Sequence, residues 1–194
     1  MNKRIISLCL ALVLLLCLLP AAAPTAAAAG DVAINETNFP DEIFRSYVSE
    51  TFDQNGDGVL SPTEISNVTE IECSQRGIAS LKGIEFFTAL ETLYCNDNQL
   101  TLLDVSRNAA LKWLYCDNNQ LKSLDVSKNT ALENLYCDGN KLTSLDVSRN
   151  TSLNGLDCGG NQLTALDVSK FEFQLDELVV CAHDFVRFDV DGLA

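Results

Sequence analysis

A repeat of 21 residues constrains the fold of this chain more than any other feature of its sequence. Four near-identical copies begin 21 residues apart, at Leu90, Leu111, Leu132 and Leu153. The second copy reads LKWLYCDNNQLKSLDVSKNTA. One such unit cannot bury its own apolar residues, so the copies must stack on one another and share a continuous core. We therefore expect a repeat array rather than a domain built around a catalytic cleft.

Cysteine and asparagine recur at fixed places between the leucines of each copy, at residues 95, 116, 137 and 158 and at residues 98, 119, 140 and 161. The alternation of Leu93 and Cys95 predicts a short strand with both side chains inward. The asparagines are expected to bond backbone groups where the chain leaves the sheet. Less regular copies flank these four. We therefore predict about six repeats over residues 68–190, with His183 in the asparagine position of the last.

The pattern LxxLxCxxNxLxxLDVSxN resembles the leucine-rich repeat family. The stretch GIASLKGIEFFTAL in the first unit looks like the repeats of bacterial internalin-type surface proteins. The resemblance implies a repeat solenoid with a curved parallel β-sheet, from a bacterial source. Because 21 residues leave too few for a helix opposite each strand, the convex side is expected to be largely non-helical.

The cysteines of the repeats allow three interpretations: reduced core thiols, disulfides or metal ligands. Buried thiols behave as small hydrophobic groups, which suits an inward position. Thiols stacked in neighbouring repeats would point in parallel rather than toward each other, which disfavours a disulfide. A secreted protein could nevertheless form disulfides. The geometry favours reduced thiols.

Residues 53–64, DQNGDGVLSPTE, match the calcium-loop pattern D-x-[DN]-x-[DN]-G-x5-E at every required position and so resemble the EF-hand family. The expected Ca²⁺ ligands are the oxygens of Asp53, Asn55, Asp57, Val59, Ser61 (through a water) and Glu64. These hard oxygen donors suit calcium. A surface turn without an ion is the alternative.

The flanks of this loop predict two helices. Pro40 can open the first, and its apolar stripe would comprise Ile43, Phe44, Tyr47, Val48 and Phe52. The second is short, with Ser61 as its N-cap and Pro62 at its first position. We expect residues 30–67 to form a small EF-hand-like helical cap on the N-terminal end of the solenoid. A lone loop suggests that calcium acts structurally.

Residues 1–29 have the features of a cleaved secretory signal peptide. Lys3 and Arg4 precede an apolar run over residues 5–19, and small residues follow it. The run is shorter than the roughly 20 residues that span a bilayer, although a membrane anchor is the alternative. We expect a secreted or cell-surface protein without membrane insertion of the mature chain, and a short tail at residues 191–194.

Charge and surface residues narrow the function. With 13 Lys+Arg against 27 Asp+Glu and a net charge of -14, the chain would repel nucleic acid. Strand positions that point to solvent carry candidate ligand-binding residues, which are Tyr94, Trp113, Tyr115, Asp117, Tyr136 and Asp138. Tyrosine and tryptophan suit binding surfaces. The alternative is that the tyrosines only stack across neighbouring strands.

These features favour a secreted module that recognises a protein or a glycan, with calcium in a structural role. A structural component of a larger cell-surface complex is the second interpretation. A surface hydrolase that uses the carboxylates of Asp117 and Asp138 is a third and weaker one, and we predict no enzyme.

Overall fold

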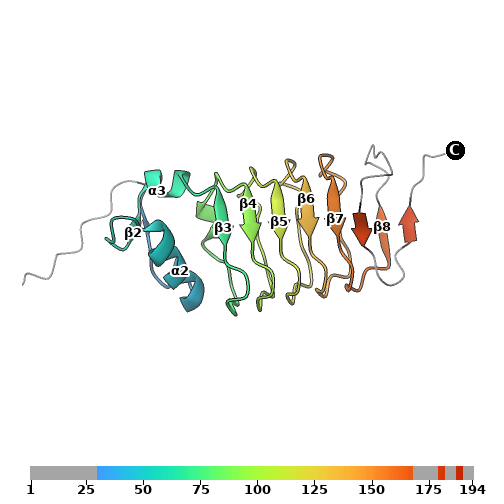
Figure 1. Cartoon of the computed structure of the whole chain (residues 1–194), viewed down its shortest axis with the longest axis horizontal. Coiled ribbons are helices and arrows are strands. Elements are labelled where there is room, and N and C mark those ends of the chain that lie inside the picture. The colour runs from blue at the N-terminus through green and yellow to red at the C-terminus, as the bar shows by residue number, and fades with distance from the viewer. Residues whose placement is uncertain (1–29, 168–178, 182–186, 190–194) are drawn as a thin grey trace, which may run out of the picture.

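The computed structural model describes residues 30–167 and two short strands at residues 179–181 and 187–189. The predicted signal peptide, His183 and the tail at residues 191–194 lie outside the described residues. A helical cap packs against one end of a row of parallel strands (Figure 1). None of the helices in the described ranges is long and apolar enough to cross a membrane.

The repeats form one six-stranded parallel sheet, as their spacing predicts. Its strands, in spatial order, are β3 (Glu70–Glu72), β4 (Thr92–Tyr94), β5 (Trp113–Tyr115), β6 (Asn134–Tyr136), β7 (Gly155–Asp157) and β9 (Val179–Cys181). Equivalent residues of successive repeats pair in register, so that Leu93 lies beside Leu114 and Leu114 beside Leu135. A second, two-stranded parallel sheet joins β8 (Ala165–Asp167) to β10 (Arg187–Asp189).

The predicted inward residues build the core. The leucines at the inward positions are buried, and so are five cysteines, at residues 73, 95, 116, 137 and 158, none of which forms a disulfide within the described residues. Burial raises the pKa of Cys73 to about 12 and raises the pKa values of Cys95, Cys116 and Cys137 well above the usual value. Because a thiolate is the form that binds metal or exchanges disulfides, this environment keeps the thiols unreactive.

Two rows of asparagines hold successive repeats together. In the row that the sequence predicts, Asn119 Nδ2 donates to Cys95 O (3.0 Å) and Cys116 O (3.2 Å), while its Oδ1 accepts from Leu100 N (2.9 Å). Asn98, Asn140 and Asn161 repeat these contacts.

The second row was missed by the sequence analysis, although its signal is the recurring final asparagine of DVSxN. It consists of Asn108, Asn129 and Asn150, all fully buried. Asn129 Nδ2 donates to Val105 O (3.0 Å) and to Asn108 O (2.8 Å) of the preceding repeat. The non-helical side of the repeats is thus tied by side-chain amides. Apart from one 3-10 turn, η1 (Ile84–Phe86), the described repeats contain no helix.

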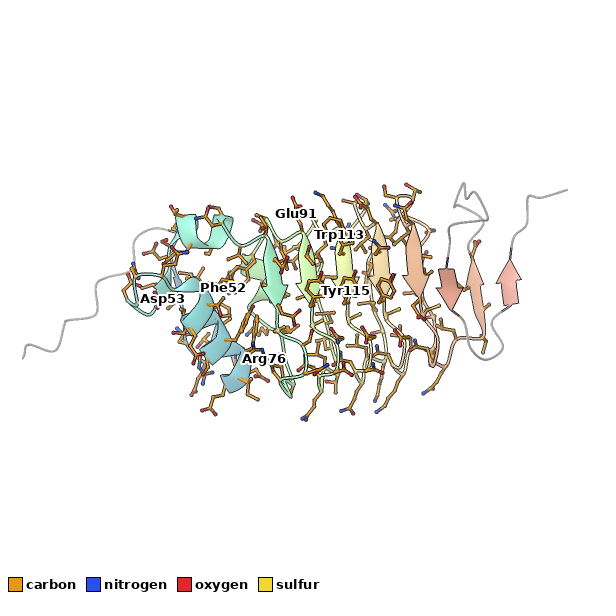
Figure 2. The ribbon with its side chains drawn as sticks, viewed as in Figure 1. Phe52, Asp53, Arg76, Glu91, Trp113 and Tyr115 are labelled. Atoms are coloured by element: carbon orange, nitrogen blue, oxygen red, sulfur yellow. The ribbon has the colours of Figure 1, made fainter. Side chains whose placement is uncertain are left out.

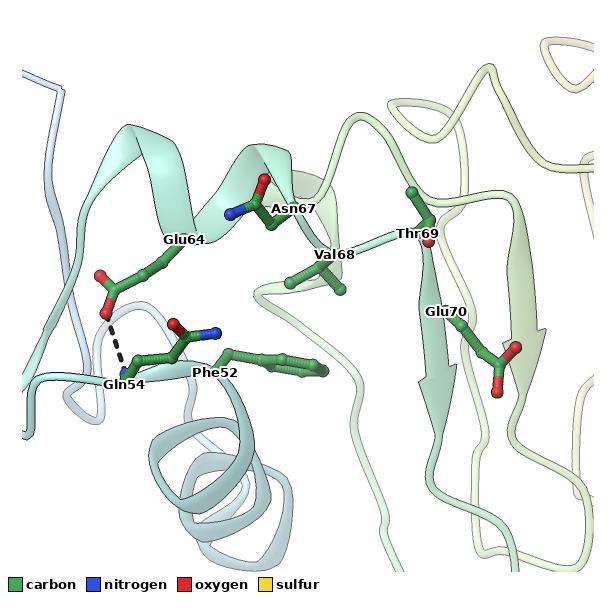
Figure 3. A pocket seen from close by; sticks show the side chains of 7 residues that line it. All are labelled: Phe52, Gln54, Glu64, Asn67, Val68, Thr69 and Glu70. Atoms are coloured by element: carbon green, nitrogen blue, oxygen red, sulfur yellow. Dashed lines mark hydrogen bonds between the residues drawn. The ribbon is translucent and has the colours of Figure 1, made fainter.

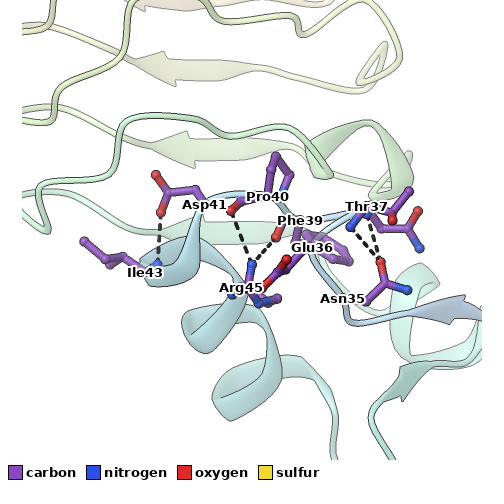
Figure 4. Close-up of polar contacts among 9 residues, drawn as sticks. Asn35, Glu36, Thr37, Phe39, Pro40, Asp41, Ile43 and Arg45 are labelled. Atoms are coloured by element: carbon purple, nitrogen blue, oxygen red, sulfur yellow. Dashed lines mark hydrogen bonds and ion pairs between the residues drawn. The ribbon is translucent and has the colours of Figure 1, made fainter.

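The cap contains β1 (Val32–Ala33), α2 (Glu42–Phe52), β2 (Val59–Leu60) and α3 (Pro62–Ser66). The prediction that Pro40 opens the first helix is wrong, because Asp41 is its N-cap and accepts from Ile43 N and Phe44 N at 3.0 Å (Figure 4). Ile43 is 44% exposed and does not join the apolar stripe. The second helix begins as predicted, with Ser61 and Glu64 forming a capping box.

Cap and repeats share one continuous apolar core. Phe39 is fully buried, with its ring centroid 5.8 Å from that of Phe86 and 6.5 Å from that of Phe87. Gly83, at φ 108°, passes so close that a Cβ would overlap the Phe39 ring. Asp41 Oδ2 also accepts from the backbone of the first repeat, at Ala79 N (2.8 Å) and Ser80 N (3.1 Å). The cap therefore covers the apolar end of the solenoid.

Candidate functional site

The carboxylate of the first residue of the predicted calcium loop accepts hydrogen bonds from three backbone N–H groups of the loop. Asp53 follows the last residue of α2; its Oδ1 accepts from Gly56 N (2.9 Å) and Asp57 N (3.2 Å), and its Oδ2 accepts from Gly58 N (2.9 Å). Gly56 and Gly58 have φ values of 71° and 80°, which glycine adopts without strain. Asp53 lies on the side of α2 that faces away from the repeats (Figure 2).

Glu64 closes the loop from its other end. Its Oε1 accepts from Gln54 N (2.9 Å), and its Oε2 accepts from Ser61 N (2.8 Å) and from the Ser61 hydroxyl (2.8 Å). These hydrogen bonds, above all the one from the Ser61 backbone, lower the pKa of the Glu64 carboxyl. The last residue of the loop is thus held against its second and ninth.

The loop is supported from within the chain. The strand β1 pairs antiparallel with β2, with Val32 opposite Leu60 and Ala33 opposite Val59. Leu60, the eighth residue of the loop, is fully buried, and Ile34 N donates to Gly58 O (2.9 Å). This pairing could not be predicted from the sequence, because the two residues of β1 are too few to show a periodic pattern.

All six predicted ligand residues lie in the loop of residues 53–64, and the atoms with which they would bind an ion are all oxygens. The Asp53 and Glu64 carboxylates accept backbone hydrogen bonds, while Asn55 Nδ2 donates to Asp57 Oδ2 (3.0 Å). Over the described residues, no group of three or more histidine, cysteine, aspartate or glutamate side chains is arranged to hold a metal ion. The donor chemistry and the glycine turns fit Ca²⁺, and its binding stays a prediction.

The second candidate site is the solvent face of the sheet, formed by the outward residues of β3–β7 and the polar residues that follow these strands. The rings of Tyr94 and Tyr115 stack at 4.7 Å and 19°, and those of Tyr115 and Tyr136 at 4.9 Å and 4°. Trp113 lies on the same strand as Tyr115 (Figure 2). The stacking alternative is therefore observed, yet these four side chains remain only partly buried.

Acidic side chains accompany the rings. Asp117 and Asp138 follow neighbouring strands, and partial burial, together with the charge of nearby carboxylates, raises the pKa of each. The Asp117 Oδ2 atom accepts from Asn118 Nδ2 (3.0 Å). The structure thus brings the predicted residues together on one exposed face.

A small pocket lies where the cap meets the first repeat (Figure 3), with a volume of about 200 Å³. Phe52 forms one wall, and Glu64 and Glu70 contribute carboxylates. The pocket has no signal in the sequence, because it arises where the chain passes from α3 to β3. It brings a predicted calcium ligand close to the edge of the sheet.

Comparison with known proteins shows which kind of repeat protein the chain is similar to. No protein-family model matches the chain. It is 41% identical to internalin J of Listeria monocytogenes serotype 4b (strain F2365) over 70 residues, which are 36% of this chain and 8% of that protein. The solved functional domain of InlJ from Listeria monocytogenes, which includes a cysteine ladder, matches 76% of this chain and 32% of its own, with a TM-score of 0.68 and 38% identity. The repeats form an internalin-like leucine-rich repeat domain.

The internalin-like domain also has a cysteine ladder, which comprises the five buried thiols of consecutive repeats. An internalin (InlF) from Listeria monocytogenes str. 4b F2365 shares the fold, with a TM-score of 0.59 at 19% identity over 84% of this chain and 55% of its own. The chain spans less than a tenth of internalin J and about a third of the InlJ structure.

Proposed function

We propose that this internalin-like domain is a secreted or surface-displayed recognition module of a bacterium, and that the solvent face of its sheet binds a protein or a glycan. The supporting observation is the stack of Tyr94, Tyr115 and Tyr136 beside Trp113, held on a rigid sheet and open to solvent. Aromatic side chains of this kind offer large contact area at little cost in conformational entropy.

Calcium has a structural role in this proposal. Asp53, Asn55, Asp57, Val59, Ser61 and Glu64 would hold the ion. The ion would supply positive charge that draws the loop carboxylates together and stabilises the folded cap, because it binds the folded loop and not the unfolded chain. The loop pairs with β1, whose neighbour Ile34 packs against the core, so tightening the loop would stabilise the cover over the repeats.

Binding rather than catalysis is supported by the setting of the carboxylates. Asp117 and Asp138 lie on an open sheet face, whereas the neighbouring Cys116 and Cys137 are buried thiols whose pKa values are raised by burial. The described pocket lies elsewhere, at the cap, and its lining includes neither aspartate. We infer that the module has no enzymatic activity.

The test is a glycan and protein array probed with the mature domain in millimolar calcium and again with chelator. Tyr115→Ala removes the middle ring of the stack and is expected to abolish binding of the recognised ligand. The matched control is Leu102→Ala, which truncates an apolar side chain that is 68% exposed, outside the sheet. Binding that survives Tyr115→Ala unchanged would contradict the proposed site. Assembly of the domain into larger particles, seen by light scattering without any array ligand, would favour the structural-component interpretation.

A further inference from the structure

The solvent face of the sheet has one sign of charge. Its acidic residues are Glu70, Glu72, Asp97, Asp117, Asp138 and Asp157. The strands and the three residues after each of them, which are residues 70–75, 92–97, 113–118, 134–139 and 155–160, include no lysine or arginine. None of these six carboxylates forms an ion pair with a residue of the described ranges. These six carboxylates therefore give the face a negative charge that no ion pair of the described residues offsets.

Two basic side chains next to these strands already have partners. Lys112 Nζ lies 2.8 Å from Glu91 Oε2 and 5.9 Å from the centre of the Trp113 ring. The Arg76 guanidinium lies 4.9 Å from the centre of the Tyr47 ring in the cap. Other basic residues, Arg107, Lys128 and Arg149, follow the DVS segments of the repeats, away from the strands. The charge of the sheet face is thus left for a partner to neutralise.

The tyrosine stack ends on this face beside one carboxylate and several glycines. In the next repeat Asp157 takes the place in register with Tyr136, and Gly155, Gly159 and Gly160 surround it. A Cβ at Gly155 would overlap Asn134 Oδ1 and lie 3.5 Å from Tyr136 Oη. Tyr136 stacks with Tyr115 but with no other ring of the described residues. Within the described residues, this end of the stack therefore lies next to the Asp157 carboxylate and the Asn134 side chain, with no further aromatic ring against it.

The group that matches this combination is a guanidinium. It is planar, stacks on aromatic rings and pairs with carboxylates through parallel N–H donors. A lysine ammonium satisfies the charge but not the stacking, and a neutral sugar satisfies the stacking but not the charge. The five strands β3–β7, about 4.8 Å apart, span roughly 19 Å, which an extended segment of about six residues would cross.

We propose that the solvent face of the sheet binds an extended, arginine-containing segment of a partner protein, with a guanidinium stacked on Tyr136 and paired with Asp138 or Asp157. This inference rests on the proposed function and specifies the partner's chemistry.

The test uses fluorescent nonapeptides with a glycine and serine background and three arginines, three lysines or three citrullines. Citrulline keeps the planar shape of arginine and removes its charge. By fluorescence anisotropy, the arginine peptide is expected to bind the mature domain best, and the citrulline peptide at least about tenfold more weakly. Raising the salt concentration should weaken arginine binding.

Variants locate the site. Asp138→Asn and Tyr136→Leu are each expected to weaken arginine-peptide binding about tenfold. The matched control Asp125→Asn removes the same charge from an exposed residue outside the sheet, whose carboxylate accepts from Ser127 N (2.9 Å), and is expected to leave binding unchanged. Thermal melts show whether each variant folds, and Asp157→Asn replaces any variant that does not.

Equal weakening by Asp138→Asn and Asp125→Asn would overturn the inference, because attraction would then be diffuse. If arginine peptides fail to bind while the array shows a glycan or neutral peptide that depends on Tyr115, the inference is wrong and the proposed function stands. If neither arginine peptides nor any array ligand depends on Tyr115, the proposed function is wrong as well.

Discussion

The cap and the repeats are stabilised in different ways. In the repeats, each contact recurs one turn later: Asn98, Asn119 and Asn140 make equivalent hydrogen bonds, and the leucines pair in register. In the cap, residues 30–67, each contact occurs once. Asp41 hydrogen-bonds both the start of α2 and the first repeat, and Glu64 hydrogen-bonds residues near both ends of the loop.

This difference indicates which changes should destabilise each region. Repeat arrays gain stability from many similar contacts between neighbouring repeats. Losing one such contact weakens the array at that place, and the binding of a small ligand elsewhere does not rebuild it. A region held by a few carboxylates can respond to an ion or to pH. The following predictions separate the two behaviours.

The largest expected effect is in the repeats. Leu114 is fully buried on β5 between Leu93 and Leu135. Leu114→Ala should destabilise the domain by about 2–5 kcal/mol, because it leaves a cavity in a close-packed core. Urea unfolding measures this change in the free energy of unfolding. The loss should be the same in calcium and in chelator, because an ion bound in the cap would add equally to the stability of both proteins. A loss that disappears in calcium would contradict this expectation.

Calcium tests the cap. If the loop binds the ion, calcium at about 100 times its dissociation constant should stabilise the domain by about 2.7 kcal/mol. The melting temperature in calcium and in chelator measures this effect. Asp53→Ala and Glu64→Ala should remove the rise, whereas Asp125→Ala, outside the loop, should keep it. Equal melting in calcium and chelator would show that the loop is a surface turn.

Asp41 tests the junction. Asp41→Ala should cost about 2 kcal/mol, because it removes the helix cap and two hydrogen bonds to the first repeat. Glu50→Ala, at an exposed position of the same helix, is the control for loss of an acidic residue. Hydrogen exchange should show faster opening of α2 and β3 than of β6. Uniform acceleration across the sheet would indicate that cap and repeats unfold as one unit.

The smallest expected effects concern pH. The pKa of Glu64 is lowered by the Ser61 backbone N–H, so its contribution to stability is present above its unfolded value of about 4.3 and is lost as pH falls through the folded value. The pKa of Asp138 is raised by partial burial, so its protonated form stabilises the fold below about 3.9, and that contribution is lost as pH rises through the folded value.

In chelator at pH 7, Glu64→Gln should therefore lower the melting temperature slightly and Asp138→Asn should raise it slightly. The Asp138 effect should stay below about 1 kcal/mol, because the carboxylate is partly solvated. Melting curves between pH 3 and pH 7 check both signs. Shifts of the same sign would show that the two carboxylates do not differ as described.

Most of the repeat architecture could be predicted from the sequence. The 21-residue period places Leu93, Leu114 and Leu135 on one inward column, because stacking is the one way for identical units to bury the same face. The limits of the cap were harder to predict. Pro40 is a residue type that opens helices, but the Asp41 side chain accepts from the first free N–H groups of α2, so the helix begins at Glu42.

Of the two candidate sites, the sequence likewise predicted the residues but not all of their contacts. The sequence predicted which residues share the sheet face, since the register repeats Tyr94, Tyr115 and Tyr136 on neighbouring strands. It could not predict the hydrogen bonds of Glu64 within the loop, or the pairing of β1 with β2, because these depend on how the chain closes in space.

By itself the sequence determined the period, the inward columns of leucine, cysteine and asparagine, and the acidic, aromatic character of one face, because each depends only on spacing along the chain. Only the tertiary structure decided how the cap seals the solenoid, through Phe39, Asp41 and Gly83, and where the tyrosine stack ends beside Asp157. The physical reason is that burial, ring stacking and hydrogen bonding between distant residues depend on distances that no spacing in the sequence specifies.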